Sequence, residues 1–181
     1  WNIIKMPYIN GKKISEHLDG FPFEKQKEIL EVIGQEVAKL HDADIIHGDL
    51  TTSNMILVEG EKIPAHLHSQ INKTDNNKQQ LESLSTLTIS KRSLVTKSDA
   101  KELISNNFKI FFIDFGLGFI SNKVEDKAVD IHLLKQALEA KHFKNWQVLF
   151  EEFLKGYKTS REENKVLERL KAVEKRGRYR H

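Results

Sequence analysis

Residues 47–54 read His-Gly-Asp-Leu-Thr-Thr-Ser-Asn, and the apolar run Met-Ile-Leu-Val follows at 55–58. Farther along the chain, a second apolar run, Ile-Phe-Phe-Ile at 110–113, leads directly into Asp-Phe-Gly at 114–116. Short apolar runs with β-branched and aromatic residues beside polar turns are typical of β-strands. We therefore expect 55–58 and 110–113 to be strands, and we pair them as a hairpin that brings the two polar motifs together.

The polar residues of these two motifs suit phosphoryl transfer. Asp49 can accept or orient the proton of an attacking hydroxyl, while Asn54 and Asp114 offer the hard oxygen ligands that Mg²⁺ prefers. Asp49 and Asn54 lie on one tight loop, so both side chains can face the same phosphate. Either motif alone is a weak signal, but their order and the strand beside each make the combination specific. The plain alternative is a polar loop and a glycine turn in an unrelated α+β domain.

Four segments show the apolar spacing of amphipathic helices. They cover 24–41, 128–141, 143–157 and 161–175. The first of them leads into the loop at 47–54 and would support it rigidly. Ser160 and Glu163 form a candidate capping box for the last helix, and Gly177 is a plausible stop.

Composition fits one globular domain, with 39% hydrophobic and 30% charged residues. No run is long and apolar enough for a membrane span, so we expect no membrane partner. Cysteine is absent, which excludes disulfides and thiolate metal sites. Residues 59–109 are mostly polar, and we expect this insertion to be largely disordered, with a weak helix near 98–105. The first residue is Trp1, which suggests part of a longer chain.

The motifs resemble the small atypical kinase subunit of the KEOPS complex. That family carries the loop found at 47–54, the Ile-Asp-Phe-Gly-Leu found at 113–117, the Glu-Asp-Lys-Ala-Val-Asp found at 125–130 and a basic Arg-Gly-Arg tail, here 176–178. The resemblance implies an α+β, protein-kinase-like fold, in which residues 1–181 form a mainly helical C-lobe with a small hairpin. It places the hinge at 1–11, the basic tail at 175–181 and the N-lobe outside this chain.

The resemblance also implies residue roles. Asp49 would be the catalytic base, and Asn54 and Asp114 would bind magnesium. Ile56 would lie under the adenine of ATP, and His47 and Asp130 would support the loop, with Asp130 receiving backbone N–H groups. The remaining residues that it assigns are the adenine-binding backbone of the hinge, Pro7, Tyr8 and Ile9, and three arginines of the tail, Arg176, Arg178 and Arg180. His132 and His142 have no such role, and we expect both to be solvated.

The function implied is an ATP- and Mg²⁺-dependent serine/threonine kinase or ATPase that supports threonylcarbamoyladenosine modification at adenosine 37 of tRNA. Its partners would be a metalloprotein subunit, other KEOPS subunits and tRNA, in the cytoplasm and nucleus. Only 117–126 separate Asp-Phe-Gly from the next motif, which argues against a signalling kinase with a long activation segment. Two alternatives stay open: a small-molecule kinase of the aminoglycoside or choline type, and a catalytically incomplete lobe that acts as a scaffold.

Overall fold

The computed structural model describes residues 8–60 and 108–177. The chain divides into two units by contact, one of residues 1–58 with 110–181 and one of residues 59–109. Nearly all of the described residues belong to the first unit. Several predictions fall outside them: most of the insertion, the weak helix near 98–105, the first part of the hinge and the tail beyond residue 177.

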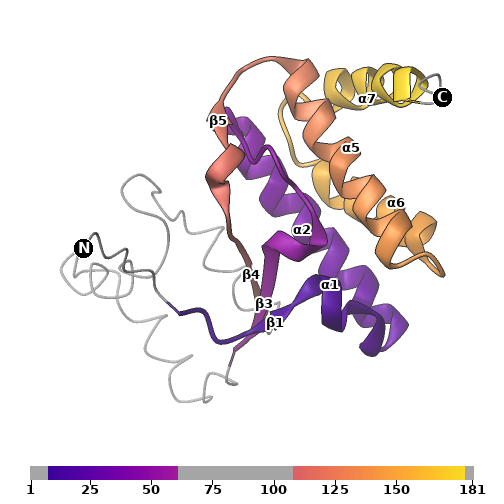
Figure 1. Ribbon diagram of the computed structural model, residues 1–181. Coiled ribbons are helices and arrows are strands. Elements are labelled where there is room, and N and C mark those ends of the chain that lie inside the picture. The colour runs from indigo at the N-terminus through magenta and orange to yellow at the C-terminus, as the bar shows by residue number, and fades with distance from the viewer. Residues whose placement is uncertain (1–7, 61–107, 178–181) are drawn as a thin grey trace, which may run out of the picture. The chain divides into compact units, whose positions relative to one another are not determined.

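The described residues form short strands beside long helices (Figure 1). The helical elements are α1 Ile14–His17, η1 Leu18–Gly20, α2 Phe23–Asp42, η2 Thr52–Asn54, η4 Phe115–Leu117, α5 Val124–Lys141, α6 Trp146–Tyr157 and α7 Glu163–Gly177. The strands are β1 Lys12–Lys13, β2 Ile45–Ile46, β3 Met55–Glu59, β4 Phe108–Phe112 and β5 Phe119–Ile120. The four predicted helices are confirmed, with shifts of a few residues at their ends.

A three-stranded sheet has the order β1-β3-β4. The neighbouring β3 and β4 are the two strands predicted to pair, so that prediction is confirmed. β1 was not predicted, because a run of two residues shows no strand period. β1 runs antiparallel to β3, with Lys12 opposite Leu57. Gly11 allows this approach, because a Cβ there would lie 2.5 Å from Ile56 Cγ2 and 2.6 Å from the Leu57 carbonyl oxygen.

A second, two-stranded sheet joins the segments that flank the two motifs. β2 and β5 are antiparallel, with Ile45 opposite Ile120 and Ile46 opposite Phe119. The helix α2 ends just before β2, where Asp44 takes a φ of 58°. The Asp44 carbonyl oxygen accepts the N–H of Ser121 at 2.8 Å, which extends the pairing by one more bond. The chain before the first motif and the chain after the second are therefore held side by side.

Helices α2 and α6 pack along each other with their backbones in close contact. Gly34 of α2 faces the carbonyl oxygen of Phe153, and Gly156 of α6 faces that of Glu31. A Cβ at either glycine would overlap the opposing oxygen. The buried apolar residues on these two helices include Ile29, Ile33, Val37, Leu149 and Phe153. This glycine-lined crossing is the centre of the helical core.

Helix α5 packs mainly against α7. Its buried face repeats at Lys127, Ile131, Leu134 and Leu138, which is the spacing of one helical stripe. α7 begins at Glu163, and Ser160 does not complete the predicted capping box. The Ser160 Oγ accepts the N–H of Glu162 at 3.4 Å and not that of Glu163, while its hydroxyl donates to Asp42 Oδ1 at 2.8 Å at the end of α2.

The prediction for His142 is wrong. His142 is only 2% exposed, and its Nδ1 lies 2.8 Å from Asp19 Oδ1. His132 is half-buried, and burial lowers the pKa of its imidazole. No helix in the described ranges is both long enough and apolar enough to cross a membrane.

Candidate functional site

The loop at residues 47–54 is anchored between β2 and β3 by its own buried residues. Leu50 and Thr52 are almost fully buried, while Asp49 and Asn54 are half-buried. Gly48 takes a φ of 80°, a conformation that glycine adopts at little cost. The loop ends in the short helix η2, whose last residue is Asn54. Apolar anchoring of this kind holds the polar side chains of the loop at the surface of a rigid support.

Asn54 binds Asp49 twice. Its side-chain nitrogen donates to Asp49 Oδ2 at 2.9 Å and to the Asp49 carbonyl oxygen at 2.9 Å. A carboxylate held in this way has one oxygen engaged and the other left for a substrate proton. Because the side-chain nitrogen of Asn54 faces Asp49, the Oδ1 atom of Asn54 is the one left to bind a cation.

A backbone hydrogen bond joins Asn54 to the residue before Asp114. The N–H of Ile113 donates to the Asn54 carbonyl oxygen at 2.9 Å, so the next residue, Asp114, is placed relative to Asn54 by a single hydrogen bond. Asp114 has φ 61° and ψ 62°, the left-handed conformation, and its side chain is exposed. That conformation costs an L residue about 1–2 kcal/mol. Such strain gathers at functional sites, where it fixes the direction of a side chain.

His47 connects the two motifs. Its Nδ1 accepts the N–H of Asp49 at 3.3 Å, so the ring proton lies on Nε2, which donates to the Ile113 carbonyl oxygen at 3.1 Å. The ring is buried and lies 4.5 Å from the centroid of Phe115. Both ring nitrogens of His47 therefore hold backbone groups, one beside Asp49 and one beside Asp114.

The carboxylate of Asp130, on α5, binds the backbone of the loop at residues 47–54. Its Oδ2 accepts the N–H of His47 at 2.8 Å, and its Oδ1 accepts the N–H of Gly48 at 3.0 Å. Asp130 is 2% exposed, so these donors compensate for the burial of its carboxylate. Gly48 also packs against Leu117, where a Cβ would overlap the Leu117 carbonyl oxygen. The loop is thus fixed to α5 on one side and to the segment after Asp114 on the other.

The candidate metal ligands are oxygen atoms of one amide and one carboxylate. Oxygen ligands fit Mg²⁺, which keeps several waters and is often bound by one or two side chains together with substrate phosphates. Among the described residues, no group of three or more His, Cys, Asp or Glu side chains comes together as a metal site. The oxygen atoms of Asn54 and Asp114 therefore fit a magnesium that is bound in part through phosphate.

The residues assigned to the adenine are only partly described. Ile56 lies half-buried on the central strand β3, and Gly11 packs against its side chain. Ile9 is half-buried, while the Tyr8 side chain is 90% exposed. Pro7 lies outside the described residues.

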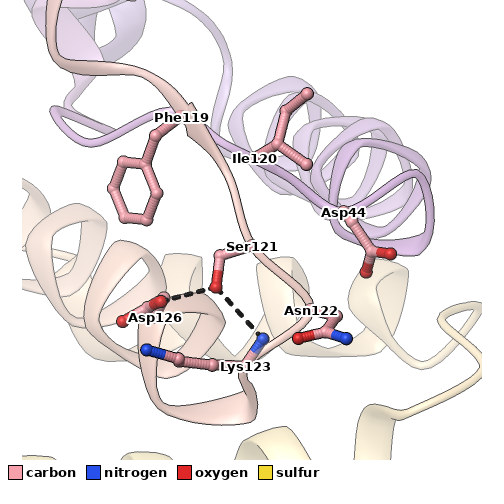
Figure 2. Close-up of a pocket in the computed structure, with 7 residues that line it drawn as sticks. All are labelled: Asp44, Phe119, Ile120, Ser121, Asn122, Lys123 and Asp126. Carbon is pink, nitrogen blue, oxygen red and sulfur yellow. Dashed lines mark hydrogen bonds between the residues drawn. The ribbon is translucent and has the colours of Figure 1, made fainter.

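A hollow of about 430 Å³ opens near the second motif but is separate from the site. Figure 2 shows it between the turn at Asp44, the strand β5 and the start of α5. The Ser121 hydroxyl donates to Asp126 Oδ2 at 2.6 Å and accepts the Lys123 N–H at 3.2 Å. Asp49, Asn54 and Asp114 do not line it.

Three buried polar residues near the site were missed by the sequence reasoning. Lys127 is 2% exposed, and its Nζ lies 3.0 Å from both Asp44 Oδ1 and Glu162 Oε2. Burial opposes the charge, but the two carboxylates outweigh it and raise the pKa of Lys127. The other two, His41 and Tyr157, lie at the ends of α2 and α6 and hydrogen-bond each other at 2.9 Å. A polar residue on an apolar helix face is the only signal the sequence offers for such sites.

Arg176 is not part of a free tail. It lies in the last turn of α7 and forms an ion pair with Glu125 of α5, which also pairs with Arg169 at 2.7 Å. The predicted tail at 175–181 therefore begins within a helix, and only residues after Gly177 can lie beyond it. Arg178 and Arg180 lie outside the described residues.

Comparison with known proteins gives consistent matches. A model of the lipopolysaccharide kinase (Kdo/WaaP) family matches residues 12–107. KEOPS complex subunit Bud32 of Pyrococcus abyssi is 35% identical over 98% of this chain and 60% of its own length. The probable serine/threonine-protein kinase BUD32 homolog of Archaeoglobus fulgidus is 32% identical over 84% of this chain and 53% of its own length.

A longer relative matches the same part of the chain. The probable bifunctional tRNA threonylcarbamoyladenosine biosynthesis protein of Methanobrevibacter smithii is 32% identical over 98% of this chain but only 23% of its own length. The chain thus spans 60%, 53% and 23% of the lengths of these three curated relatives.

Proposed function

Because this chain belongs to the lipopolysaccharide kinase (Kdo/WaaP) family, we propose that the full-length protein cleaves the terminal phosphate of ATP at Asp49, Asn54 and Asp114. One observation carries the proposal. Asn54 holds the Asp49 carboxylate with its side chain and the residue before Asp114 with its backbone, at 2.9 Å in each case. A candidate base and two candidate metal ligands are therefore built around one residue.

Each residue has a separate task in this proposal. Asp49 orients a hydroxyl or a water and accepts its proton, because the oxygen not bound by Asn54 is free to do so. Asn54 Oδ1 and Asp114 bind the cation. Magnesium-bound ATP supplies the phosphoryl group, and the cation neutralises charge on its phosphates. His47 and Asp130 hold the two motifs in register and take no part in proton transfer.

We further propose that this activity serves tRNA modification. The support is the printed names of the relatives: one is a KEOPS subunit, another a bifunctional protein of threonylcarbamoyladenosine biosynthesis. The partners would then be the other KEOPS subunits, including a metalloprotein, and tRNA. Phosphorylation of serine or threonine is the finer activity that the name of the Archaeoglobus fulgidus relative suggests.

Transfer to a small hydroxylated molecule is the second candidate. The description of the matching family, which names lipopolysaccharide, supports a hydroxyl of a sugar-containing acceptor as against one of a protein. The two candidates share the same site chemistry and differ only in the acceptor.

The test is a radiolabelled phosphate assay on the full-length protein. We expect release or transfer of label from [γ-³²P]ATP that needs Mg²⁺, stops with a chelator and is lost in Asp49→Asn. Label in protein or free phosphate supports the kinase or ATPase, and label in a small sugar-containing product supports the second candidate. Turnover in Asp49→Asn equal to that of the parent contradicts the proposal, and no turnover in the parent favours a scaffold.

A further inference from the structure

Lys127 of α5 is a buried cation to which the proposed function gives no task. It is 2% exposed, and its Nζ lies 3.0 Å from both Asp44 Oδ1 and Glu162 Oε2. Burial disfavours the charge, but hydrogen bonds with Glu162 and Asp44 raise the pKa of Lys127 above 10.5, so the ammonium is charged at neutral pH. Asp44 follows the end of α2 and Glu162 directly precedes α7, so one cation joins three segments of the chain.

The two carboxylates depend on this cation. Because each lies 3.0 Å from Nζ, they stand at most about 6 Å apart, a range at which like charges repel. The Asp44 side chain is 45% exposed, against 32% for Glu162. Without the ammonium, Asp44 is therefore the residue that can more easily turn its carboxylate toward water.

The backbone of Asp44 binds the segment that follows Asp114. Its carbonyl oxygen accepts the Ser121 N–H at 2.8 Å, next to the pairing of β2 with β5 (Figure 2). Asp44 has a φ of 58°, a left-handed conformation that costs an L residue free energy and needs support from its surroundings. Lys127 holds the side chain of this turn and Ser121 its carbonyl oxygen, so the turn is fixed from two sides.

The segment 114–121 is held at both of its ends. At the first end, the residue before Asp114 donates its N–H to the Asn54 carbonyl oxygen at 2.9 Å. At the second end, β5 pairs with β2, and Ser121 donates to Asp44. Asp114 itself is left-handed and exposed, and such a residue keeps its conformation only where the structure around it determines it. A shift of the second end would therefore change the direction of the Asp114 carboxylate.

We propose that Lys127 and Asp44 are positioning residues for Asp114, the candidate magnesium ligand. Lys127 holds the Asp44 side chain, and the Asp44 carbonyl oxygen holds Ser121, so the far end of the segment that begins at Asp114 stays in place. The proposal rests on the proposed function of the site, because it concerns the binding of magnesium-bound ATP. It adds two residues that touch neither the cation nor a phosphate, and it gives Glu162 no part in positioning.

The test compares four variants of the full-length protein. Lys127→Met removes the cation. Asp44→Gly removes one carboxylate but keeps a residue that adopts a positive φ at little cost, and Asp44→Asn is the conservative variant, because its amide oxygen can still accept from Nζ. Glu162→Ala is the matched control, since it removes the other carboxylate at the same 3.0 Å from Lys127 and leaves the Asp44 turn intact.

Four quantities are measured for each variant. They are the affinity for ATP over a series of Mg²⁺ concentrations, the turnover at saturating Mg²⁺ and ATP, the thermal stability and the hydrogen exchange of the Ser121 amide. The Mg²⁺ series separates positioning from a general loss of folded protein. A displaced metal ligand raises the Mg²⁺ concentration that ATP binding needs, whereas partial unfolding lowers the amount of binding at every Mg²⁺ concentration.

We expect Asp44→Gly to raise the Mg²⁺ concentration for half-maximal ATP binding by about tenfold, the lower end of the loss when a residue that orients a metal ligand is removed. Lys127→Met should raise it at least as much, and Asp44→Asn should recover most of the loss. Saturating Mg²⁺ should restore turnover, because Asp49 keeps its place. The Ser121 amide should exchange faster in Asp44→Gly and Lys127→Met, but not in Glu162→Ala, when rates are compared at equal global stability.

Two results would overturn the inference. One is a Mg²⁺ requirement in Asp44→Gly equal to that in Glu162→Ala. The other is unchanged exchange of the Ser121 amide in Asp44→Gly. If Lys127→Met does not fold, the two Asp44 variants decide. If the parent binds no ATP in the presence of Mg²⁺, the proposed function fails, and the exchange of the Ser121 amide still decides whether Lys127 and Asp44 hold the segment.

Discussion

The side-chain nitrogen of Asn54 lies 2.9 Å from Asp49 Oδ2, five residues away on the same loop. This contact makes Asn54 both a support for the candidate base and a candidate metal ligand, because its nitrogen serves one and its oxygen remains for the other. Two functions in one amide explain why the loop needs an asparagine there and not an aspartate, which has no donor.

Substitution of Asn54 separates these two functions. Asn54→Asp keeps an oxygen ligand for Mg²⁺ but places a second carboxylate against Asp49, so the hydrogen bond is replaced by repulsion. We expect turnover to fall by about 10²–10⁴-fold, the usual contribution of a positioned base, while ATP binding in Mg²⁺ is largely kept. Asn54→Ala should lose both turnover and ATP binding in Mg²⁺. Steady-state kinetics measure the turnover and calorimetric titration measures the binding. Full turnover in Asn54→Asp contradicts the assignment.

The close contact of α2 and α6 predicts that a single methyl group added there lowers the free energy of unfolding. In Gly34→Ala the new Cβ would overlap the Phe153 carbonyl oxygen, and backbone atoms cannot rotate away. Overpacking of this kind costs about 1–3 kcal/mol or more, so we expect a clear drop in urea stability. Gly20→Ala is the control, since no atom lies within 4 Å of a Cβ there. Equal stability of the two variants would show that the helices can separate at little cost.

Much of the fold could be predicted from local patterns. The helical periodicities and the pairing of 55–58 with 110–113 are confirmed, and the relatives confirm the resemblance to the KEOPS kinase subunit. The two-residue strands β1, β2 and β5 were not predicted, since a run of two residues has no period. The capping box at Ser160 was wrong: its Oγ accepts the N–H of Glu162 and not that of Glu163, and its hydroxyl donates to Asp42, which is far away in the sequence.

The candidate site could be predicted only in part. Asp49, Asn54 and Asp114 stand in a recognisable order, so their residue types alone indicate a chemistry. Asp130 could be found only through the resemblance, because an aspartate in a helix gives no sign of burial. The bonds between His41, Tyr157 and Asp130 span up to 116 residues, and no local pattern predicts contacts over such separations.

Glu162 predicts a pH dependence of stability. Its hydrogen bond with Lys127, and then that with Lys165, lower the pKa of Glu162 from the ordinary value of 4.5. A group whose folded pKa is lowered adds stability above its unfolded pKa and loses it as the pH falls through the folded pKa. The stability difference between the parent and Glu162→Gln should therefore be constant above pH 4.5 and shrink below it.

Urea unfolding as a function of pH measures this difference. In a Lys127→Met background the acid-dependent part should be smaller, because the main partner of Glu162 is gone. A difference that stays the same from neutral to strongly acidic pH in the parent background would contradict the role of Lys127.

The basic end of the chain predicts salt-dependent tRNA binding. Each phosphate contact by Arg releases counterions, so affinity falls with salt. Replacing Arg176, Arg178 and Arg180 with Ala should reduce the slope of log affinity against log salt by up to about two to three units. Arg176 should contribute least, because it already pairs with Glu125. Arg161→Ala, at an exposed arginine outside this segment, is the control, and a triple variant that binds like the parent contradicts the prediction.

Nucleotide binding and turnover, measured together in Asp114→Ala and Asp49→Ala, test the site most directly. Both full-length variants should be folded and without phosphotransfer, since one lacks a metal ligand and the other a base. Binding of ATP in the presence of Mg²⁺ should be strongly weakened in Asp114→Ala and nearly unchanged in Asp49→Ala. Turnover equal to that of the parent in either variant, or equal loss of nucleotide binding in both, would contradict these roles.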